Sequence, residues 1–173
     1  MWLMVSSRRL LYFAYGSNMF TRRLRDRAPS ARPFGIARLP GHRLAWHKIG
    51  RDGSAKCDIR ETGRPDDFVW GILFEIASAE KSVLDRAEGL GCGYEYKTVS
   101  LFAQGLAIEA GTYYATHIDV SLRPFDWYLS FVLAGAREHG LPSTYLSALT
   151  SISAVNDPDV DRRKRNLALL QGA

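Results

Sequence analysis

One carboxylate in this chain, Glu88, lies where it could transfer protons. It follows Leu84 by four residues in a segment expected to be helical, so it shares the face that Leu84 turns toward the core. It also lies in the last turn before Gly89, where the negative end of the helix dipole disfavours a further negative charge. Partial burial and the dipole both favour the protonated form of a carboxyl group. A carboxyl group in that state can shuttle protons near neutral pH, which makes Glu88 the residue to single out. The alternative is a surface glutamate beside the apolar face.

A second candidate lies near the N-terminus, where the apolar run Tyr12-Phe13-Ala14-Tyr15 stops at Gly16-Ser17-Asn18. A buried strand that ends in glycine exposes backbone N–H groups, and Ser and Asn add side-chain donors at the same point. This arrangement predicts a pocket for a carboxylate or a carbonyl group. A tight turn followed by a helix cap is the alternative interpretation.

Other reactive residues are less well placed. His42, His47 and Cys57 could be metal ligands, but the period of two along a strand puts the two histidines on opposite faces, so we expect no metal site. Ser17 has no His or Lys nearby in the sequence to activate it as a nucleophile. Gly16 is not part of a phosphate-binding loop. We expect no cofactor.

The charge of the chain is moderately basic. The 173 residues carry 23 Lys and Arg against 18 Asp and Glu, a formal net charge of +5. The arginines cluster within 22–27 and 162–165, as in proteins that bind nucleic acid. Acidic residues interrupt both clusters and no aromatic residues alternate with them, so we favour two solvated faces and expect no nucleic-acid partner.

The compartment is suggested by two cysteines, Cys57 and Cys92, which are too few for a disulfide framework. We expect a reducing, cytoplasmic setting. The apolar segment 1–5 is much shorter than a signal-peptide core, and no apolar run is long enough to span a membrane.

The order of predicted elements is typical of an α+β fold. The strands come in runs, which favours a mixed, mostly antiparallel curved sheet or a small β-barrel flanked by helices. We predict one domain over 1–155 and a basic, helical C-terminal tail over 156–173. The predicted strands are 12–15, 32–48 (one or two strands with a bend at Pro40-Gly41), 54–60, 67–76, 94–102 and 106–115, and the predicted helices are 19–27, 78–88, 124–138 and 143–150.

Local signals set the predicted helix ends. Ser78 is a good N-cap residue, and Gly89 is positioned to end the same helix. Val83, Leu84 and Ala87 would form its inner face. Pro124 is expected in the first turn of the next helix. Within the strand 67–76, Gly71 indicates a bulge or a close approach of another backbone.

Three motifs together resemble a known family, the γ-glutamylcyclotransferases, and are most similar to its members that act on γ-glutamyl-amino acids. The resemblance spans roughly 11–152, and Val69-Trp70-Gly71 also fits the pattern between the first two motifs. The motifs are YFAYGSN at 12–18, LDRAEG at 84–89 and GAREHGLPSTY at 135–145.

The resemblance implies a mixed β-barrel with a pocket at its mouth, and it implies roles for single residues. The loop from Tyr12 to Ser17 would hold a glutamyl group through backbone N–H groups, and Glu88 would be the general base and acid. Tyr145 would contact the glutamyl group, and either Tyr94 or Tyr96 would face the pocket. A homodimer is also implied.

The implied reaction needs no water, metal or cofactor. The freed α-amine of a γ-glutamyl compound attacks its own γ-carbonyl group, closes the lactam 5-oxoproline and releases an amine. The small-molecule substrate could be a γ-glutamyl-amino acid, a γ-glutamylamine or a γ-glutamyl-acyl antibiotic intermediate. A non-catalytic small-molecule binding protein of the same fold is the alternative from another class.

Overall fold

The structure, a computed structural model, describes residues 8–172. Five strands close into a barrel, and two more form a separate hairpin. The barrel contains β1 (Arg9–Ala14), β2 (Arg32–Pro40), β5 (Phe68–Ala77), β6 (Tyr94–Ala103) and β7 (Leu106–Ala115); the hairpin contains β3 (His42–Ile49) and β4 (Ala55–Glu61); the helices are α1 (Thr21–Arg25), α2 (Lys81–Glu88), α3 (Asp126–Glu138), α4 (Ser143–Thr150) and α5 (Val160–Ala168), with short 3-10 turns η1 (Ser17–Met19) and η2 (Ser78–Glu80).

The barrel confirms the predicted α+β class. Its strands follow the order β1-β5-β2-β6-β7, and all neighbouring pairs in that order are antiparallel. A parallel pairing of β1 with β7, through Tyr12 and Gly111, closes the barrel. Closure removes exposed edges that could otherwise pair with another chain. Closure also brings β1 beside β7, whose residues lie about a hundred positions further along the sequence.

The central strand β5 is nearly continuous in its burial, because both of its faces are covered. Ile72, Leu73 and Phe74 are all fully buried, as expected for an apolar run without alternation. At Gly71 an added Cβ atom would lie 2.4 Å from the carbonyl oxygen of Ala14. The predicted close backbone approach is therefore confirmed, and it fixes β5 against the end of β1.

The segment 32–48 is two strands rather than one, with the bend where Pro40-Gly41 predicts it. The hairpin of β3 and β4 has a β-bulge between Trp46 and Lys48, which interrupts the strict alternation assumed for His42 and His47. Both histidines are buried and have partners: His42 Nδ1 lies 2.8 Å from the carbonyl oxygen of Pro40, and His47 Nε2 lies 2.8 Å from Asp58. Each is held by a structural contact.

The helix that carries Glu88 differs from its prediction at its start. Ser78 opens the 3-10 turn η2, makes no capping bond, and instead donates through its hydroxyl to the carbonyl oxygen of Arg8 at 2.6 Å. The predicted N-cap is therefore wrong, because the hydroxyl of Ser78 binds the backbone just before β1 instead of the start of α2. At the other end Gly89 takes the left-handed conformation with φ of 77°, which confirms the predicted end.

The predicted inner face of α2 is also too wide. Only Leu84 is buried, whereas Val83 is 42% exposed and Ala87 is exposed. A helix of two turns contacts the barrel along a narrow line, so one apolar residue suffices. Elsewhere, α1 is shorter than predicted because η1 takes up residues 17–19. Pro124 precedes the N-cap of α3 at Phe125, so it lies outside the first turn where we expected it.

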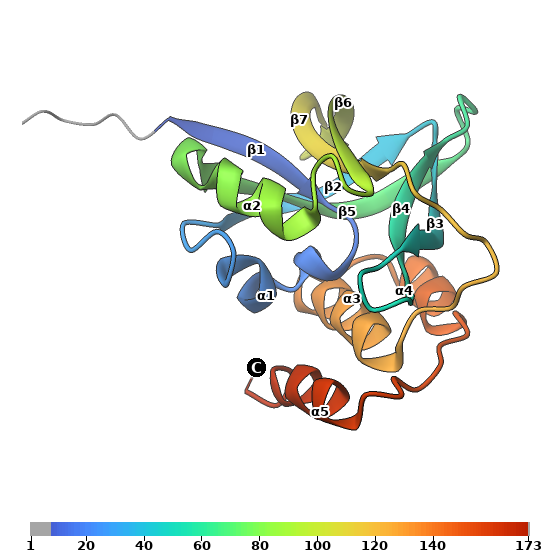
Figure 1. Ribbon diagram of the computed structural model, residues 1–173. Coiled ribbons are helices and arrows are strands. Elements are labelled where there is room, and N and C mark those ends of the chain that lie inside the picture. Colours follow the sequence, from blue (N-terminus) through green and yellow to red (C-terminus); the bar gives the residue numbers. More distant parts are fainter. Residues whose placement is uncertain (1–7, 173) are drawn as a thin grey trace, which may run out of the picture.

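The C-terminal helices gather on one side of the barrel, with α3 packed against it (Figure 1). Phe131, Val132 and Ala136 of α3 are fully buried. The segment 156–172 contains the predicted helix, α5, and polar contacts attach it to α3. The Trp127 indole donates to Asp157 at 2.8 Å, and Arg163 pairs with Asp126 at the start of α3, while Arg162 pairs with Asp157 within the segment at 2.6 Å.

Candidate active site

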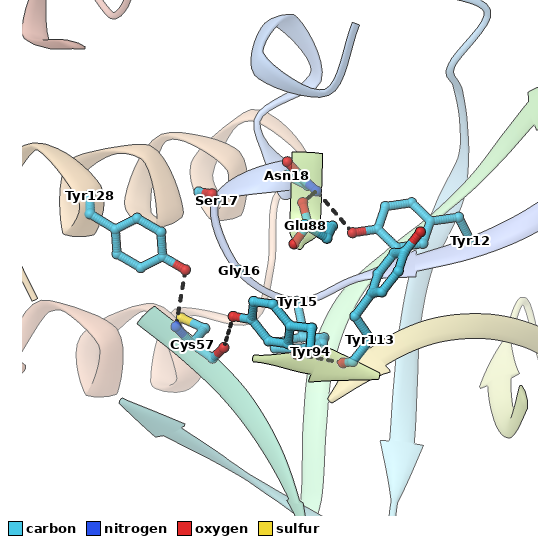
Figure 2. Close-up of a pocket in the computed structure, with 10 residues that line it drawn as sticks. All are labelled: Tyr12, Tyr15, Gly16, Ser17, Asn18, Cys57, Glu88, Tyr94, Tyr113 and Tyr128. Atoms are coloured by element: carbon cyan, nitrogen blue, oxygen red, sulfur yellow. Dashed lines mark hydrogen bonds between the residues drawn. The ribbon is translucent and has the colours of Figure 1, made fainter. Parts of the chain in front are cut away.

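Glu88 ends α2 and points toward the turn that follows β1 (Figure 2). Its side chain is 14% exposed. Asn18 donates from Nδ2 to Glu88 Oε1 at 2.8 Å, and Arg27 donates from Nη1 to the same oxygen at 2.8 Å. Both donors are directed at one oxygen of the carboxylate, so they fix the orientation of the group. Glu88 is therefore no free surface residue.

The turn opposite Glu88 is tightly packed. A Cβ atom on Gly16 would lie 3.1 Å from Cys57 Cβ and 3.2 Å from the hydroxyl oxygen of Tyr128, so glycine allows this close approach. Ser17 and Asn18 follow in η1 and are only 8% and 5% exposed. Within residues 8–172, the backbone N–H groups of Gly16, Ser17 and Asn18 donate to no protein acceptor. These N–H groups are available to a ligand.

Tyrosines form much of the wall of a pocket between the turn and Glu88 (Figure 2). Each makes a hydrogen bond: Tyr15 donates to the carbonyl oxygen of Tyr113 at 2.6 Å, and Tyr94 donates to that of Cys57 at 2.5 Å. The hydroxyl of Tyr12 accepts from Asn18 at 3.0 Å. The pocket tyrosines are Tyr12, Tyr15, Tyr94, Tyr113 and Tyr128.

Burial raises the pKa of every one of these tyrosines. They are therefore uncharged near neutral pH and offer oriented hydroxyl dipoles. Tyr113 donates to Asp85 at 2.6 Å, and this hydrogen bond further favours its protonated form. The tyrosine wall of the pocket is thus neutral, and the ionisable side chain at its rim is Glu88, which pairs with Arg27 outside the pocket.

The structure brings together most of the residues selected from the sequence. Phe13 and Ala14 lie in the same loop but have fully buried side chains in the barrel core. Of the two candidate tyrosines, Tyr94 lines the pocket, whereas Tyr96 packs on Tyr113 with ring centroids 5.3 Å apart. The selected residues that line the pocket are Tyr12, Tyr15, Gly16, Ser17, Asn18, Glu88 and Tyr94.

Tyr145 lies apart from this group. It belongs to α4, its hydroxyl is buried without a hydrogen-bond partner among residues 8–172, and it is not among the residues that line the pocket. The rest of the third motif supports the turn from behind. A Cβ atom on Gly135 would lie 2.5 Å from the backbone of Met19, and Glu138 Oε2 accepts from the backbone N–H of Thr21 at 3.0 Å. This motif positions η1.

The first basic cluster, at 22–27, is not the simple solvated face that the sequence predicts, because two of its arginines turn inward. Arg27 binds Glu88, and Arg23 donates from Nε to Ser17 Oγ at 3.1 Å. The guanidinium of Arg23 also stacks on the Phe131 ring at 4.5 Å. Burial lowers the pKa of Arg23 to about 10, so it stays charged at neutral pH. In the second cluster Arg162 and Arg163 form ion pairs but stay partly exposed, and Lys164 and Arg165 are exposed, as expected for a solvated face.

Sequence reasoning missed four residues of the site: Arg27, Cys57, Tyr113 and Tyr128. The three motifs do not contain them, and each comes from a separate element. The only available signal was the basic residue at 27, just before the predicted helix end.

Within residues 8–172 no group of three or more His, Cys, Asp or Glu side chains is arranged to hold a metal ion. No helix in the same range has the length and apolar character needed to cross a membrane.

Comparisons with known proteins identify the family of the chain. A family model described as AIG2-like matches residues 68–149. A γ-glutamylcyclotransferase of Bos taurus is 34% identical over 82% of this chain and 78% of that protein, and the one of Homo sapiens is 33% identical over the same shares. A solved structure named gamma-glutamyl cyclotransferase superimposes with a TM-score of 0.86 at 28% identity, covering 96% of this chain and 100% of that one.

The closed barrel and its glutamate-bearing pocket define the fold class that the solved gamma-glutamyl cyclotransferase shares. Within that class, the chain belongs to the γ-glutamylcyclotransferase family and is an enzyme. The reaction of that family converts a γ-glutamyl compound to 5-oxoproline and a free amine.

Proposed function

We propose that the enzyme cyclises γ-glutamyl-amino acids, with Glu88 as the general base and acid. The observation that carries this proposal is the position of the Glu88 carboxylate, which Asn18 and Arg27 hold at the rim of the tyrosine-lined pocket. A carboxyl group fixed beside a neutral pocket is placed to exchange a proton with an ammonium group bound there.

The proposed reaction proceeds in balanced steps. Glu88 accepts a proton from the α-ammonium group of the substrate, and the freed nitrogen attacks the γ-carbonyl carbon. A bond forms between that nitrogen and carbon, which closes the five-membered ring. Glu88 then gives its proton to the leaving nitrogen as the bond between that nitrogen and the γ-carbon breaks. The ring nitrogen still carries two hydrogens, and one of them passes as a proton to the released amine, which becomes the ammonium group of the free amino acid. The products are 5-oxoproline and an amino acid, and the carboxylate of Glu88 is regenerated.

The turn after β1 would contribute binding and charge stabilisation. The free backbone N–H groups of Gly16, Ser17 and Asn18 could face the oxygen on which negative charge develops. Tyr12 and Tyr94 would bound the glutamyl group with their rings and hydroxyls. Phe13 and Ala14 would contribute only their backbone, because their side chains are in the core. We assign Tyr145 to support of the pocket rather than to direct contact.

A substrate panel tests the proposal. Release of 5-oxoproline is measured from γ-glutamyl-alanine, glutathione and γ-glutamyl-ε-lysine. We expect release from γ-glutamyl-alanine, with equal amounts of 5-oxoproline and alanine. Release from γ-glutamyl-ε-lysine alone would contradict the substrate while keeping the mechanism, and no release from any of the three by folded protein would contradict both.

We also propose a cytoplasmic homodimer. Both cysteines are free, Cys57 buried and Cys92 exposed, which fits a reducing compartment. Exposed apolar side chains on the β6–β7 hairpin, Phe102 at 47% and Leu106 at 63%, could take part in an interface. The mass in solution from light scattering tests the dimer; a monomer at micromolar concentration would contradict it.

A further inference from the structure

A second cavity opens beside the tyrosine pocket, with Ser17, Glu88, Tyr94 and Tyr128 lining both. It is the larger of the two, about 250 Å³ against about 30 Å³ on the same measure. Five cationic and two anionic side chains line it. The cations are Arg23, Arg27, Lys48, Arg51 and Lys56, and the anions are Asp52 and Glu88.

The two anions neutralise only two of these cations. Lys56 donates to both carboxylate oxygens of Asp52, at 2.8 and 3.0 Å, and Arg27 is paired with Glu88. Within residues 8–172 no salt bridge pairs Arg23, Lys48 or Arg51 with a carboxylate. The cavity therefore carries an excess of positive charge that the described protein does not balance.

Lys48 is the most informative of these cations. Its residue is only 6% exposed, yet its ammonium forms no hydrogen bond or ion pair with any of residues 8–172. Its closest aromatic neighbour is Tyr94, with the ammonium 4.6 Å from the ring centroid. Burial lowers the pKa of Lys48, with Arg51 adding to the effect and Glu88 opposing it. Lys48 Nζ is not among the enclosed side-chain atoms of the described residues that lack a hydrogen bond, so the ammonium at the end of the buried stem opens onto the cavity. An anion in the cavity could therefore contact it.

The location of the cavity relates it to the reaction. Arg51 lies next to the end of α2, where its guanidinium would be 3.5 Å from a Cβ atom on Gly89. The leaving nitrogen must be within reach of Glu88 to receive a proton, and the groups attached to it then extend from Glu88 into the cavity. An α-carboxylate on the leaving amino acid would balance one positive charge. More than one unpaired cation would remain.

We propose that this cavity is a subsite for the leaving amino acid, and that it selects γ-glutamyl compounds whose leaving amino acid carries a second carboxylate, as aspartate and glutamate do. The inference rests on the proposed function, because it assumes that Glu88 marks the scissile bond. The second carboxylate would bind between Lys48 and Arg51. Their charges attract it, and the recessed cavity limits screening by salt.

The test compares two substrates of nearly equal shape, γ-glutamyl-glutamate and γ-glutamyl-glutamine. We expect kcat/KM to be at least about tenfold higher for the acidic substrate. Lys48→Met and Arg51→Gln should each reduce this ratio at least about threefold. Because Lys48 is buried and its replacement could unfold the hairpin, the exposed Arg51 provides the second variant. Lys164→Met on α5, far from the cavity lining, is the matched control and should keep the ratio.

The outcomes separate the two proposals. Turnover of both substrates with equal kcat/KM, or a ratio unchanged in both variants, would overturn the subsite and leave the proposed cyclisation standing. Absence of 5-oxoproline from every γ-glutamyl-amino acid would overturn the proposed function, and the subsite with it. A preference for the acidic substrate that both variants reduce would support the subsite.

Discussion

Arg27 donates from Nη1 to Glu88 Oε1 at 2.8 Å, although the two residues are 61 positions apart in the sequence. The same nitrogen donates to Asn18 Oδ1 at 2.8 Å, and Asn18 Nδ2 donates in turn to Glu88 at 2.8 Å. The three side chains therefore bind one another in a closed triangle. The proposed base has its direction fixed before substrate binds.

Arg27→Gln should remove one side of this triangle. The carboxylate would lose its cationic neighbour and part of its orientation, so we expect kcat to fall about 10- to 100-fold with a smaller change in KM. Steady-state kinetics on γ-glutamyl-alanine measure both constants. Arg22→Gln, on the exposed face of α1, is the control. A kcat for Arg27→Gln that equals that of the control would show that Arg27 does not position the base.

Gly135→Ala should disturb the turn after β1 from a distance. The new Cβ atom would lie 2.5 Å from the backbone carbon of Met19 and the nitrogen of Phe20, so α3 or η1 must shift. We expect a loss of about 1–3 kcal/mol in the free energy of unfolding, as for other overpacked sites. Urea denaturation measures it, with Arg137→Ala on the exposed face of α3 as the control. A change below about 0.5 kcal/mol would mean that the contact is easily relaxed.

Asp157 should make stability depend on acidity. The Arg162 guanidinium, with a further bond from the Trp127 indole, holds the pKa of the Asp157 carboxyl well below its usual value. Its stabilisation is present above the unfolded-state pKa, about 3.9, and is lost as pH falls through the lower folded-state value. Asp157→Asn should cost about 1–3 kcal/mol at pH 7. The difference from wild type should shrink below about pH 4.

Urea denaturation of both proteins at pH 7 and at pH 3 measures this difference. A gap of equal size at the two pH values would mean that the charge of Asp157 contributes nothing. The result also bears on α5, because Asp157 accepts from both Arg162 of α5 and the Trp127 indole of α3 and so links the two helices.

The two thiols should differ in reactivity. Burial raises the pKa of the Cys57 thiol to about 12, whereas Cys92 is exposed in the loop after α2. Thiolate is the reactive form, so a disulfide reagent at pH 8 should modify one thiol rapidly and the second only after unfolding. Cys92→Ser should remove the rapid phase. Rapid modification of Cys57 in the folded protein would contradict the packing around Gly16.

Glu88 could be located from the sequence because its signals are local. The spacing from Leu84 and the glycine at 89 both lie within two helical turns, and the structure retains both. The run ending in Gly16-Ser17-Asn18 is local as well. The first of these segments predicts a carboxylate that transfers protons, and the second predicts a pocket for a carboxylate or carbonyl group of a ligand.

The remainder of the site depends on barrel closure, which no local pattern shows. The pairing of Tyr12 with Gly111 brings Tyr113 beside Tyr12, and the packing of α3 brings Tyr128 to Cys57. Arg27 was interpreted as solvent-facing because a basic run looks alike whether its side chains reach water or a buried carboxylate. The predictions of a cap at Ser78 and of a buried Val83 are wrong for a related reason, because both depend on tertiary contacts. The hydroxyl of Ser78 binds the backbone of Arg8, and of the predicted inner face only Leu84 is buried.

The most direct test of the account compares the release of 5-oxoproline from γ-glutamyl-alanine by the wild-type enzyme and by Glu88→Gln. Glu109→Gln, at an exposed position of β7, is the matched control. Glutamine can still accept the bond from Asn18 but cannot take up the proton. We expect wild-type rates in the control and a loss of at least about 10²-fold in Glu88→Gln, with the two variants equally stable in urea. A folded Glu88→Gln enzyme that keeps most of its activity would contradict the assignment of Glu88 as the base.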